Sequence, residues 1–509
     1  MRIIFGRNLH TSMIRNIFTT SLLLAFSLSI SAQGYKYKFN VEGVKDTLIY
    51  LAKYYGKKQY YEDTAKVDSK GNFVFEGEEM LPGGIYLMVM PDKASYFELA
   101  VSGTETEFEI RTKKSDLLQS AQATGSPENE AFYEYQRFIS EKGVKADGLN
   151  TNIKAAKEAG NEKEAKRYQD ELQKINSEVQ AFKKEFIAKH LDKLITKVLL
   201  ASEDPVIPED LKSIGDETLD QAKLRWYKDN YFNDFDFSDD RLLRSPVFHR
   251  KLDYYMQKLV IQIPDSIIKE AEEIIAKTKG NKETFKYVVH YVTNTYEKSK
   301  LMGMDAIFVH MAKKYYMTGQ AYWMDSTKIA KVEERAKALE PLLLGKVAPN
   351  IILPDTNGEN GTWHNLHQIP AKFTVLYFWD SGCGHCKKAT PKLVKWFNEL
   401  DKNRSIAIFA VGTELENGDW KKFIKKNGLN FINVSDTPEI NKNAAKYINK
   451  TTLASLNFRN TYDIYSTPVV YILDQNKEII AKKLGVEQIG DFIDRYEKEA
   501  EKMAEEKLH

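Results

Sequence analysis

The spacing of apolar and polar residues divides the chain into three parts, and the first of them alternates. Between residues 35 and 113, apolar side chains take every second position in short runs such as 37–41 and 73–75. Such alternation is typical of strands that bury one face and expose the other. Turn-forming residues separate the runs, for example at 69–72. The pattern predicts an antiparallel, sandwich-like β domain over residues 33–122.

The second part of the chain has a helical pattern. Ser126 followed by Pro127 is a typical helix start, because serine caps the first turn and proline fits its first position. A stretch rich in lysine and glutamate follows, with apolar residues at alternating spacings of three and four: Leu172, Ile175, Val179, Phe182 and Phe186. This predicts an α-helical domain over residues 123–344. The apolar seam packs either on a neighbouring helix of the same chain or on a second copy in a homodimer.

The third part, residues 345–509, combines both patterns. Residues 373–379 form an almost continuous apolar run, which predicts a strand buried on both faces. A short turn follows at 380–382, and then a helical pattern that includes Leu393 and Phe397. Strands and helices that follow one another in this way predict an α/β domain. The whole chain is therefore expected to be a multidomain protein.

Composition excludes several classes of protein. The chain has 509 residues, of which 29% are charged and 42% hydrophobic. These values are typical of folded domains and unlike those of disordered or membrane-embedded chains. The formal net charge of +2 gives no support for binding to nucleic acid.

Residues 1–32 have the pattern of a secretory signal. Arg15 precedes an apolar stretch at 17–30, and small residues follow at 29–33, where a signal peptidase would cut. A membrane anchor is the alternative, but a spanning helix needs about 20 apolar residues. No cysteine lies near the cleavage region, which argues against a lipoprotein anchor. The sequence therefore predicts a periplasmic protein whose signal peptide is removed.

Cys383 and Cys386 are the two cysteines of the chain, and both lie at the predicted junction between strand and helix. The first turn of a helix carries unpaired N–H groups and partial positive charge, so a thiolate there is stabilised. Its pKa can fall from about 8.5 to roughly 3.5–7.5. Cys383 is the expected nucleophile and Cys386 the expected resolving thiol. The imidazolium of His385 is expected to stabilise the Cys383 thiolate further and so to raise the reduction potential.

The C-terminal domain resembles thioredoxin-fold disulfide oxidoreductases of the TlpA/ResA type, which are AhpC/TSA-like. Four separated features carry the resemblance: Phe378-Trp379, Cys383-Gly384-His385-Cys386, Pro391 and Thr467-Pro468. The resemblance implies a thioredoxin fold for residues 345–509, with Pro468 in the cis form facing the cysteines. It also implies that Trp379, Thr467 and Pro468 contact the substrate and that no cofactor is required. β and helical domains of the predicted kind often accompany such modules in exported proteins.

Two positions depart from the pattern of this family. Thioredoxin itself has a buried aspartate six residues before its first active-site cysteine, where this chain has Tyr377. Reductases of the ResA type often have an acid three residues after the second cysteine, where this chain has Ala389. Both acids relay protons to the resolving thiol. Without these acids, the family pattern does not imply fast, thioredoxin-like reduction of disulfide substrates. Asp380 or water would have to relay the proton instead.

Other uses of the cysteine pair fit the sequence less well. A structural zinc site needs four ligands, and the nearby candidates are His364 and His367. Attachment of haem needs a histidine directly after the second cysteine, where the chain has Lys387. A peroxiredoxin-like peroxidase would need a lone peroxidatic cysteine. We therefore predict neither a metal site nor a cofactor.

The sequence thus predicts an exported thiol–disulfide oxidoreductase. Its Cys383–Cys386 pair would exchange with protein thiols and disulfides, and a redox partner would supply or accept electrons. One alternative is a partner-binding protein with a minor or regulatory redox domain, because the long β and helical parts contain no catalytic motif. A peroxiredoxin-like peroxidase is the other alternative.

Overall fold

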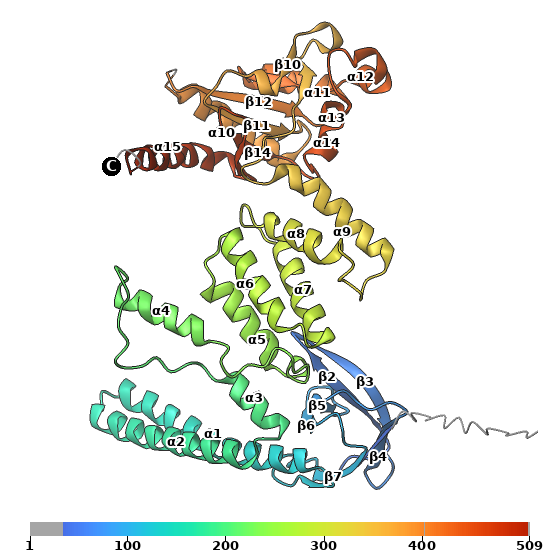
Figure 1. Cartoon of the computed structure of the whole chain (residues 1–509), viewed down its shortest axis with the longest axis vertical. Helices are drawn as coiled ribbons and strands as arrows, with labels where there is room; N and C mark the ends of the chain where they lie inside the picture. The colour runs from blue at the N-terminus through green and yellow to red at the C-terminus, as the bar shows by residue number, and fades with distance from the viewer. Residues whose placement is uncertain (1–33, 402, 507–509) are drawn as a thin grey trace, which may run out of the picture.

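The computed structural model describes residues 34–401 and 403–506. Its parts follow one another along the long axis: strands and a long helix pair at one end, further helices in the middle, and an α/β domain at the other end (Figure 1). The predicted signal segment lies outside the described residues. Among the described helices, none is long and apolar enough to cross a membrane.

Eight strands form two four-stranded sheets in the N-terminal part, in the orders β4-β1-β7-β8 and β3-β2-β5-β6. Aromatic side chains from the first sheet, such as Phe39 and Phe108, pack in the core that both sheets share. The predicted fold class is confirmed with one difference: β1 pairs with β7 in parallel. The strands are β1 (Tyr35–Glu42), β2 (Leu48–Tyr55), β3 (Lys58–Lys66), β4 (Asn72–Gly77), β5 (Gly84–Val89), β6 (Tyr96–Val101), β7 (Glu107–Lys113) and β8 (Gln122–Thr124).

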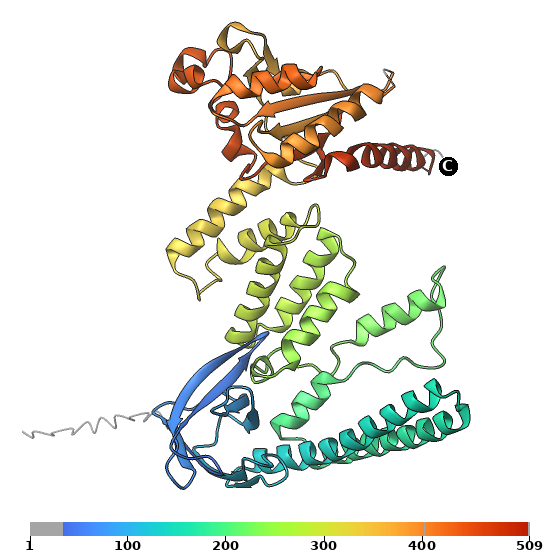
Figure 2. The ribbon, with the colours of Figure 1, turned by 180° about the vertical axis from the view of Figure 1, so that it is seen from behind.

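Two long helices, α1 (Pro127–Glu158) and α2 (Glu162–Lys189), lie side by side along most of their lengths (Figure 2). The Ser126 side chain caps α1 by accepting the N–H of Asn129 at 3.3 Å, as its sequence predicts. The apolar seam of α2 packs on α1, and the rings of Phe138 and Phe182 stack with centroids 3.8 Å apart. Of the two predicted partners for the seam, the structure therefore shows the neighbouring helix.

Shorter helices continue the middle part and share its core with the sheets. One continuous cluster of buried side chains runs from the strands into these helices and includes Tyr86, Phe132 and Phe248. The β and helical parts are thus packed as one body, although the sequence pattern changes between them. The helices are α3 (Leu194–Ser202), α4 (Leu219–Asn230), α5 (Val247–Tyr254), α6 (Pro264–Lys277), α7 (Lys282–Glu297), α8 (Asp305–Met311) and α9 (Ser326–Leu339).

The C-terminal domain is built on a five-stranded sheet of order β13-β12-β11-β14-β15. Its central strand, β11 (Phe373–Trp379), is buried at every position, as the apolar run predicts. Separate apolar clusters cover the two faces of the sheet. The other strands are β12 (Ile406–Gly412), β13 (Ile432–Val434), β14 (Val469–Leu473) and β15 (Ile479–Lys482), and a small hairpin of β9 (Ile352–Pro354) and β10 (Trp363–Asn365) precedes them.

Helices surround this sheet and complete the α/β fold. Helix α10 (Gly384–Glu399) follows the central strand directly and contains Pro391. The segment between β13 and β14 holds three short helices, which make this connection longer than a simple crossover. The helices are α11 (Asn417–Asn427), α12 (Pro438–Lys442), α13 (Leu453–Leu456), α14 (Phe458–Thr461) and α15 (Ile489–Glu506).

The C-terminal domain is tied to the helical part by buried polar contacts and by backbone pairing. The ammonium of Lys482, 2% exposed, contacts the carboxylate of Asp305 and donates to the carbonyl oxygen of Leu342 at 2.6 Å. The connecting segment also pairs with β15, since Ile479 donates its N–H to Lys346 O at 2.8 Å. Separating the two partners of a buried ion pair would leave a buried charge without compensation, which destabilises the fold. This junction therefore favours one arrangement of the two parts.

Candidate active site

The two cysteines lie where the central strand β11 passes into helix α10. Cys383 occupies the capping position of the helix, and Cys386 lies in its first turn. The intervening turn is held by Asp380, whose carboxylate accepts the N–H of Gly382 at 2.6 Å. Both side chains are free thiols in this structure. The predicted strand-to-helix placement is therefore confirmed, and the helix N-terminus faces Cys383.

The two thiols have opposite environments. The backbone N–H of Cys386 at the helix tip contributes most to holding the pKa of Cys383 below its usual value, and the contact with Thr467 and then the backbone N–H of His385 add to it. Burial raises the pKa of Cys386 to about 11, because the apolar surroundings disfavour its thiolate. Cys383 is partly exposed, whereas Cys386 is completely buried. The structure thus separates an ionisable, accessible thiol from one that stays protonated.

Thr467 and Pro468 face the accessible thiol. The peptide bond between them is cis, which confirms the prediction for Pro468. The Sγ atom of Cys383 donates to the carbonyl oxygen of Thr467 at 3.3 Å. Both Thr467 and Pro468 are half-buried, so part of this loop remains open to a bound molecule. The structure brings these two predicted residues together with Cys383.

The structure corrects the role predicted for Trp379. Its side chain is completely buried, and its ring packs on Phe423 with a centroid separation of 5.2 Å. A side chain enclosed in this way has no surface to offer a substrate. Trp379 is instead part of the apolar layer that also contains Cys386. An apolar run that ends in tryptophan does not show whether the last ring is buried or exposed, so the sequence could not predict this difference.

His385 is exposed, and its imidazole makes no hydrogen bond to any described residue. The histidine contributes to the low pKa of Cys383 through its backbone N–H. The stabilisation by the imidazolium that the sequence predicts would come in addition to this backbone interaction, and it stays a prediction. Any residue with an N–H group at this position can supply the backbone interaction.

Tyr377 occupies the place at which thioredoxin has its buried aspartate. Its hydroxyl lies 2.8 Å from the Thr390 hydroxyl, and both side chains are buried. Burial raises the pKa of Tyr377 far above its usual value, so the phenol remains neutral. The interior beside Cys386 therefore contains hydroxyl groups where thioredoxin has a carboxylate. This neutral surrounding contributes to keeping Cys386 protonated.

Glu414 is a residue of the site that the sequence did not indicate. Its carboxylate accepts both the backbone N–H and the hydroxyl of Ser381, the hydroxyl at 2.8 Å. Burial raises the pKa of Glu414 above its usual value. The carboxylate thus ties the loop before Cys383 to the end of β12. Glu414 and Ser381 are 33 positions apart, and no motif links them in the sequence.

Arg459 connects the helical segment before Pro468 to the same loop region. Its guanidinium makes two contacts of 2.8 Å with the buried carboxylate of Asp436. Its Nε donates to the carbonyl oxygen of Thr413 at 2.9 Å. A guanidinium held by a bidentate carboxylate has little rotational freedom. The inserted helices are therefore fixed to the end of β12, next to Glu414.

Helix α9 of the helical part also contacts the loop that precedes Thr467. Arg335 of α9 makes an ion pair with Asp463, whose side chain is only 10% exposed. The same guanidinium lies 5.9 Å from the ring centre of Tyr465, which is 86% exposed. Asp463 and Tyr465 belong to the loop that continues to Thr467. The helical part thus holds the loop that faces Cys383.

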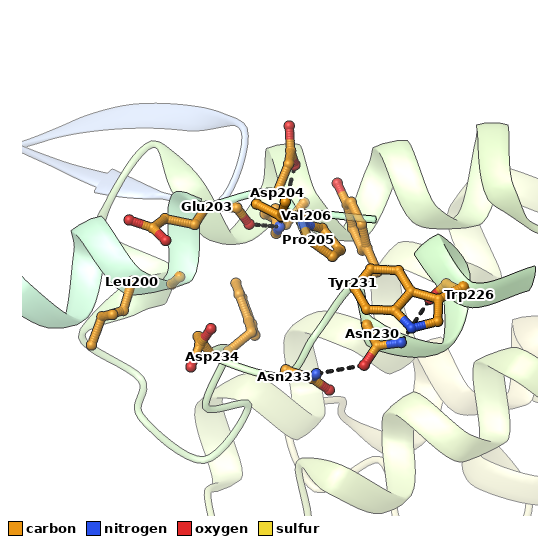
Figure 3. A pocket seen from close by; sticks show the side chains of 13 residues that line it. Leu200, Glu203, Asp204, Pro205, Val206, Trp226, Asn230, Tyr231, Asn233 and Asp234 are labelled. Carbon is orange, nitrogen blue, oxygen red and sulfur yellow. Dashed lines mark hydrogen bonds and ion pairs between the residues drawn. The ribbon is translucent and has the colours of Figure 1, made fainter. Parts of the chain in front are cut away.

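A separate cavity of about 280 Å³ lies in the helical part, between the end of α3 and helix α4 (Figure 3). Lys251 lines it and donates to the carbonyl oxygen of Glu203 at 2.6 Å. Its ammonium also lies 3.6 Å from Asp204 and 4.0 Å from the ring centre of Tyr231. Burial lowers the pKa of Lys251. Partners from the chain itself thus surround this cation, and we interpret the cavity as structural.

Comparisons with known proteins agree with this geometry. Residues 344–482 match the model of the AhpC/TSA family. The C-terminal domain is a thioredoxin-fold domain of the TlpA/ResA type. Two families described only as domains of unknown function, DUF4369 and DUF5106, match residues 35–132 and 160–340. The TlpA/ResA-type domain is thus preceded by two extra regions.

Among curated proteins, the chain is similar to the thiol-disulfide oxidoreductase ResA of Bacillus subtilis (strain 168). The two are 33% identical over 98 residues, which is 19% of this chain and 52% of that protein. The chain thus spans about half the length of the curated relative that it matches.

Solved structures similar to the chain include a domain of a possible thiol-disulfide isomerase from Cytophaga hutchinsonii. It is 41% identical and covers 32% of this chain and 98% of its own, with a TM-score of 0.26. A thioredoxin-like protein from Bacteroides caccae is 16% identical and covers 57% of this chain and 96% of its own, with a TM-score of 0.43.

The difference in pKa between the two thiols gives a direct prediction. In the reduced protein near pH 7, iodoacetamide should modify Cys383 at least about tenfold faster than Cys386, because each pKa unit changes the thiolate fraction about tenfold. Peptide mapping after short exposures would measure both rates. The Cys383 rate should level off at a lower pH than the Cys386 rate, whose midpoint should lie at about 11. Faster modification of Cys386 would reverse the assignment of the two thiols.

Proposed function

We propose that the chain is an exported thiol–disulfide oxidoreductase that acts on protein disulfides through Cys383 and Cys386. The observation that carries this proposal is the contrast between the two thiols, one accessible with a lowered pKa and one buried with a raised pKa. Similarity to a thiol-disulfide oxidoreductase over part of the chain supports the same chemistry. Export rests on the signal-like pattern of residues 1–32 and places the reaction in the periplasm.

The reaction follows from thiol–disulfide exchange. The Cys383 thiolate attacks one sulfur of a substrate disulfide, which forms a mixed disulfide and releases the other substrate sulfur as a thiolate that takes a proton. Cys386 then loses its proton and attacks the Sγ atom of Cys383. This step releases the second substrate thiolate and leaves a disulfide between Cys383 and Cys386. Two electrons have then passed to the substrate, and the reverse sequence oxidises a dithiol.

The site residues have distinct tasks in this proposal. Cys383 is the nucleophile and Cys386 resolves the mixed disulfide. The backbone of Thr467 and the ring of Pro468 line the surface where an extended substrate segment would lie, because that loop contacts Cys383. His385 contributes through its backbone N–H, and its imidazolium would stabilise the Cys383 thiolate further. A redox partner is needed to restore the starting state of the cysteine pair after each turnover.

A partner-binding role for the remaining chain is the second candidate. The β and helical parts share one core and contact the redox domain through Arg335 and Lys482. This arrangement suits a body that presents the redox domain to a partner. In that case the thiol chemistry would be secondary to binding, and turnover of general disulfide substrates would be low.

Cysteine variants of the full chain distinguish these candidates. The wild type should reduce insulin disulfides with dithiothreitol as electron source, and Cys383→Ser should abolish that activity because no nucleophile remains. Cys386→Ser should accumulate mixed disulfides with substrate, visible as reductant-sensitive bands on non-reducing gels. Cys383→Ser serves as the control that traps nothing. Absence of turnover in the wild type, or trapping by Cys383→Ser, would contradict the proposed oxidoreductase.

The contact between α9 and the Thr467 loop gives a second prediction. Arg335→Ala should lower kcat/KM for a protein disulfide about fivefold, because an unpaired Asp463 loosens the loop that receives the substrate, at a cost of about 1 kcal/mol. Reduction of glutathione disulfide, which needs little of this surface, should change less than about twofold.

Arg404→Ala is the matched control for this variant. Arg404 is 30% exposed, compared with 33% for Arg335, and it pairs with Asp494 and Glu497 on the far side of the redox domain. Removing it also deletes ion pairs of an arginine, here two, but leaves the Thr467 loop intact. An equal loss of activity in both variants would show that Arg335 acts only through general stability.

A further inference from the structure

A second cavity lies where the β part meets the helices. The tip of the β2–β3 hairpin reaches helices α5 and α7 in both views of the chain (Figure 1, Figure 2). A cavity of about 540 Å³ opens at this seam, with lining residues from the hairpin, from both helices and from Trp323. Pockets for small molecules typically measure about 300–1,000 Å³. The space is therefore large enough for a ligand of several rings or substituents.

Close packing fixes the wall of this cavity. Gly56 forms the hairpin turn with a φ of +58°, and a Cβ atom at this position would lie 2.0 Å from the hydroxyl oxygen of Tyr287. The Gly56 N–H donates to the carbonyl oxygen of Leu243 at 2.9 Å. Beside it, the Tyr55 hydroxyl donates to Glu283 at 2.9 Å. The hairpin is thus held against the helices, and the cavity is a built feature of the seam.

Charge around the cavity is strongly one-sided. Lys57, Lys58, Lys286 and Lys298 line it, whereas Asp253 is the acidic residue among its lining. Asp253 already accepts the hydroxyl of Tyr291 at 2.9 Å. Within residues 34–401 and 403–506, only Lys286 of these lysines has a carboxylate within 4.0 Å, that of Glu283 at 3.5 Å. Three unpaired ammonium groups therefore surround one space.

Aromatic rings form the rest of the lining. Tyr55, Tyr60, Tyr287 and Tyr291 contribute rings, and their mutual contacts are edge-on where they touch, as for Tyr55 and Tyr287 at 5.7 Å. The ring of His249 lies beside them, with its Nδ1 2.9 Å from the Tyr287 hydroxyl. Aromatic walls favour a planar ring as ligand, because ring faces and edges attract each other. Ammonium groups at the mouth favour a negative charge on that ring.

We propose that this seam is a binding site for a small organic anion that carries an aromatic or similar planar ring. The ring lies among the tyrosines, and its negative group meets the ammonium groups of Lys57, Lys58 and Lys298. The site is distant from Cys383 in the fold, so binding of the anion does not depend on the redox chemistry. It also gives the β and helical parts a task in which their shared seam, rather than a catalytic motif, is the functional feature.

Fluorescence titration of the full chain with anilinonaphthalene sulfonate, an aromatic anion, tests the proposal. Saturable binding at one site per chain is expected. Lys298→Gln should weaken it about fivefold, because one ammonium group is lost. Lys300→Gln is the matched control. Lys300 is also an exposed lysine just after the end of α7, but its side chain does not line the cavity. Its affinity should equal that of the wild type.

Two further ligands separate ring recognition from charge recognition. Phenylnaphthylamine has the same rings without the sulfonate and should bind at least about fivefold more weakly. Inorganic sulfate at equal concentration should not displace the dye. No saturable binding, equal affinity in Lys298→Gln, equal affinity for the neutral dye, or efficient displacement by sulfate would each overturn the proposal.

Discussion

The interaction between helix-tip N–H groups and the Cys383 sulfur is the feature on which the proposed redox function depends. It lowers the pKa of one thiol, while burial raises that of its neighbour to about 11. Both effects need the same geometry: a fully buried central strand, a short turn and a helix that begins at Cys383. Glu414 and Arg459 hold the turn and the inserted helices in place. These polar contacts therefore fix the loop before Cys383 and the helices beside it.

The β and helical parts contribute to the surroundings of Cys383 from outside the redox domain. They share a single core, and α9 reaches the loop that faces Cys383 through Arg335. Lys482 adds a buried ion pair at the same junction. The loop that faces Cys383 is therefore supported from two parts of the chain. The cavity at the hairpin seam lies in the other direction, away from the cysteines.

Local sequence signals predicted the centre of the site well. The apolar run of β11, the cysteine pair at the helix start and the cis Pro468 were all expected, because each depends on neighbours within a few residues or on a motif of the family. Residues whose role depends on distant parts of the chain were missed. Glu414 contacts Ser381 across 33 positions and Arg335 contacts Asp463 across 128.

Two further differences have the same origin. Trp379 ends a buried strand, and its ring is enclosed by packing with residues distant in the sequence, such as Phe423. The parallel pairing of β1 with β7 depends on the path of the chain through the second sheet. Alternation along a strand predicts which face is buried and says nothing about the direction of its neighbour. The sequence therefore predicted elements better than it predicted their partners.

The reduction potential of the Cys383–Cys386 pair tests the central claim most directly. Equilibration with glutathione buffers should place the wild type above thioredoxin's roughly −270 mV, because a stabilised thiolate favours the reduced form. His385→Gln keeps the backbone N–H and measures the contribution of the imidazolium alone, whereas His385→Pro also removes that donor and should lower the potential further. A wild type at or below roughly −270 mV, or an unchanged potential in His385→Pro, would contradict the claim that helix-tip N–H groups stabilise the Cys383 thiolate.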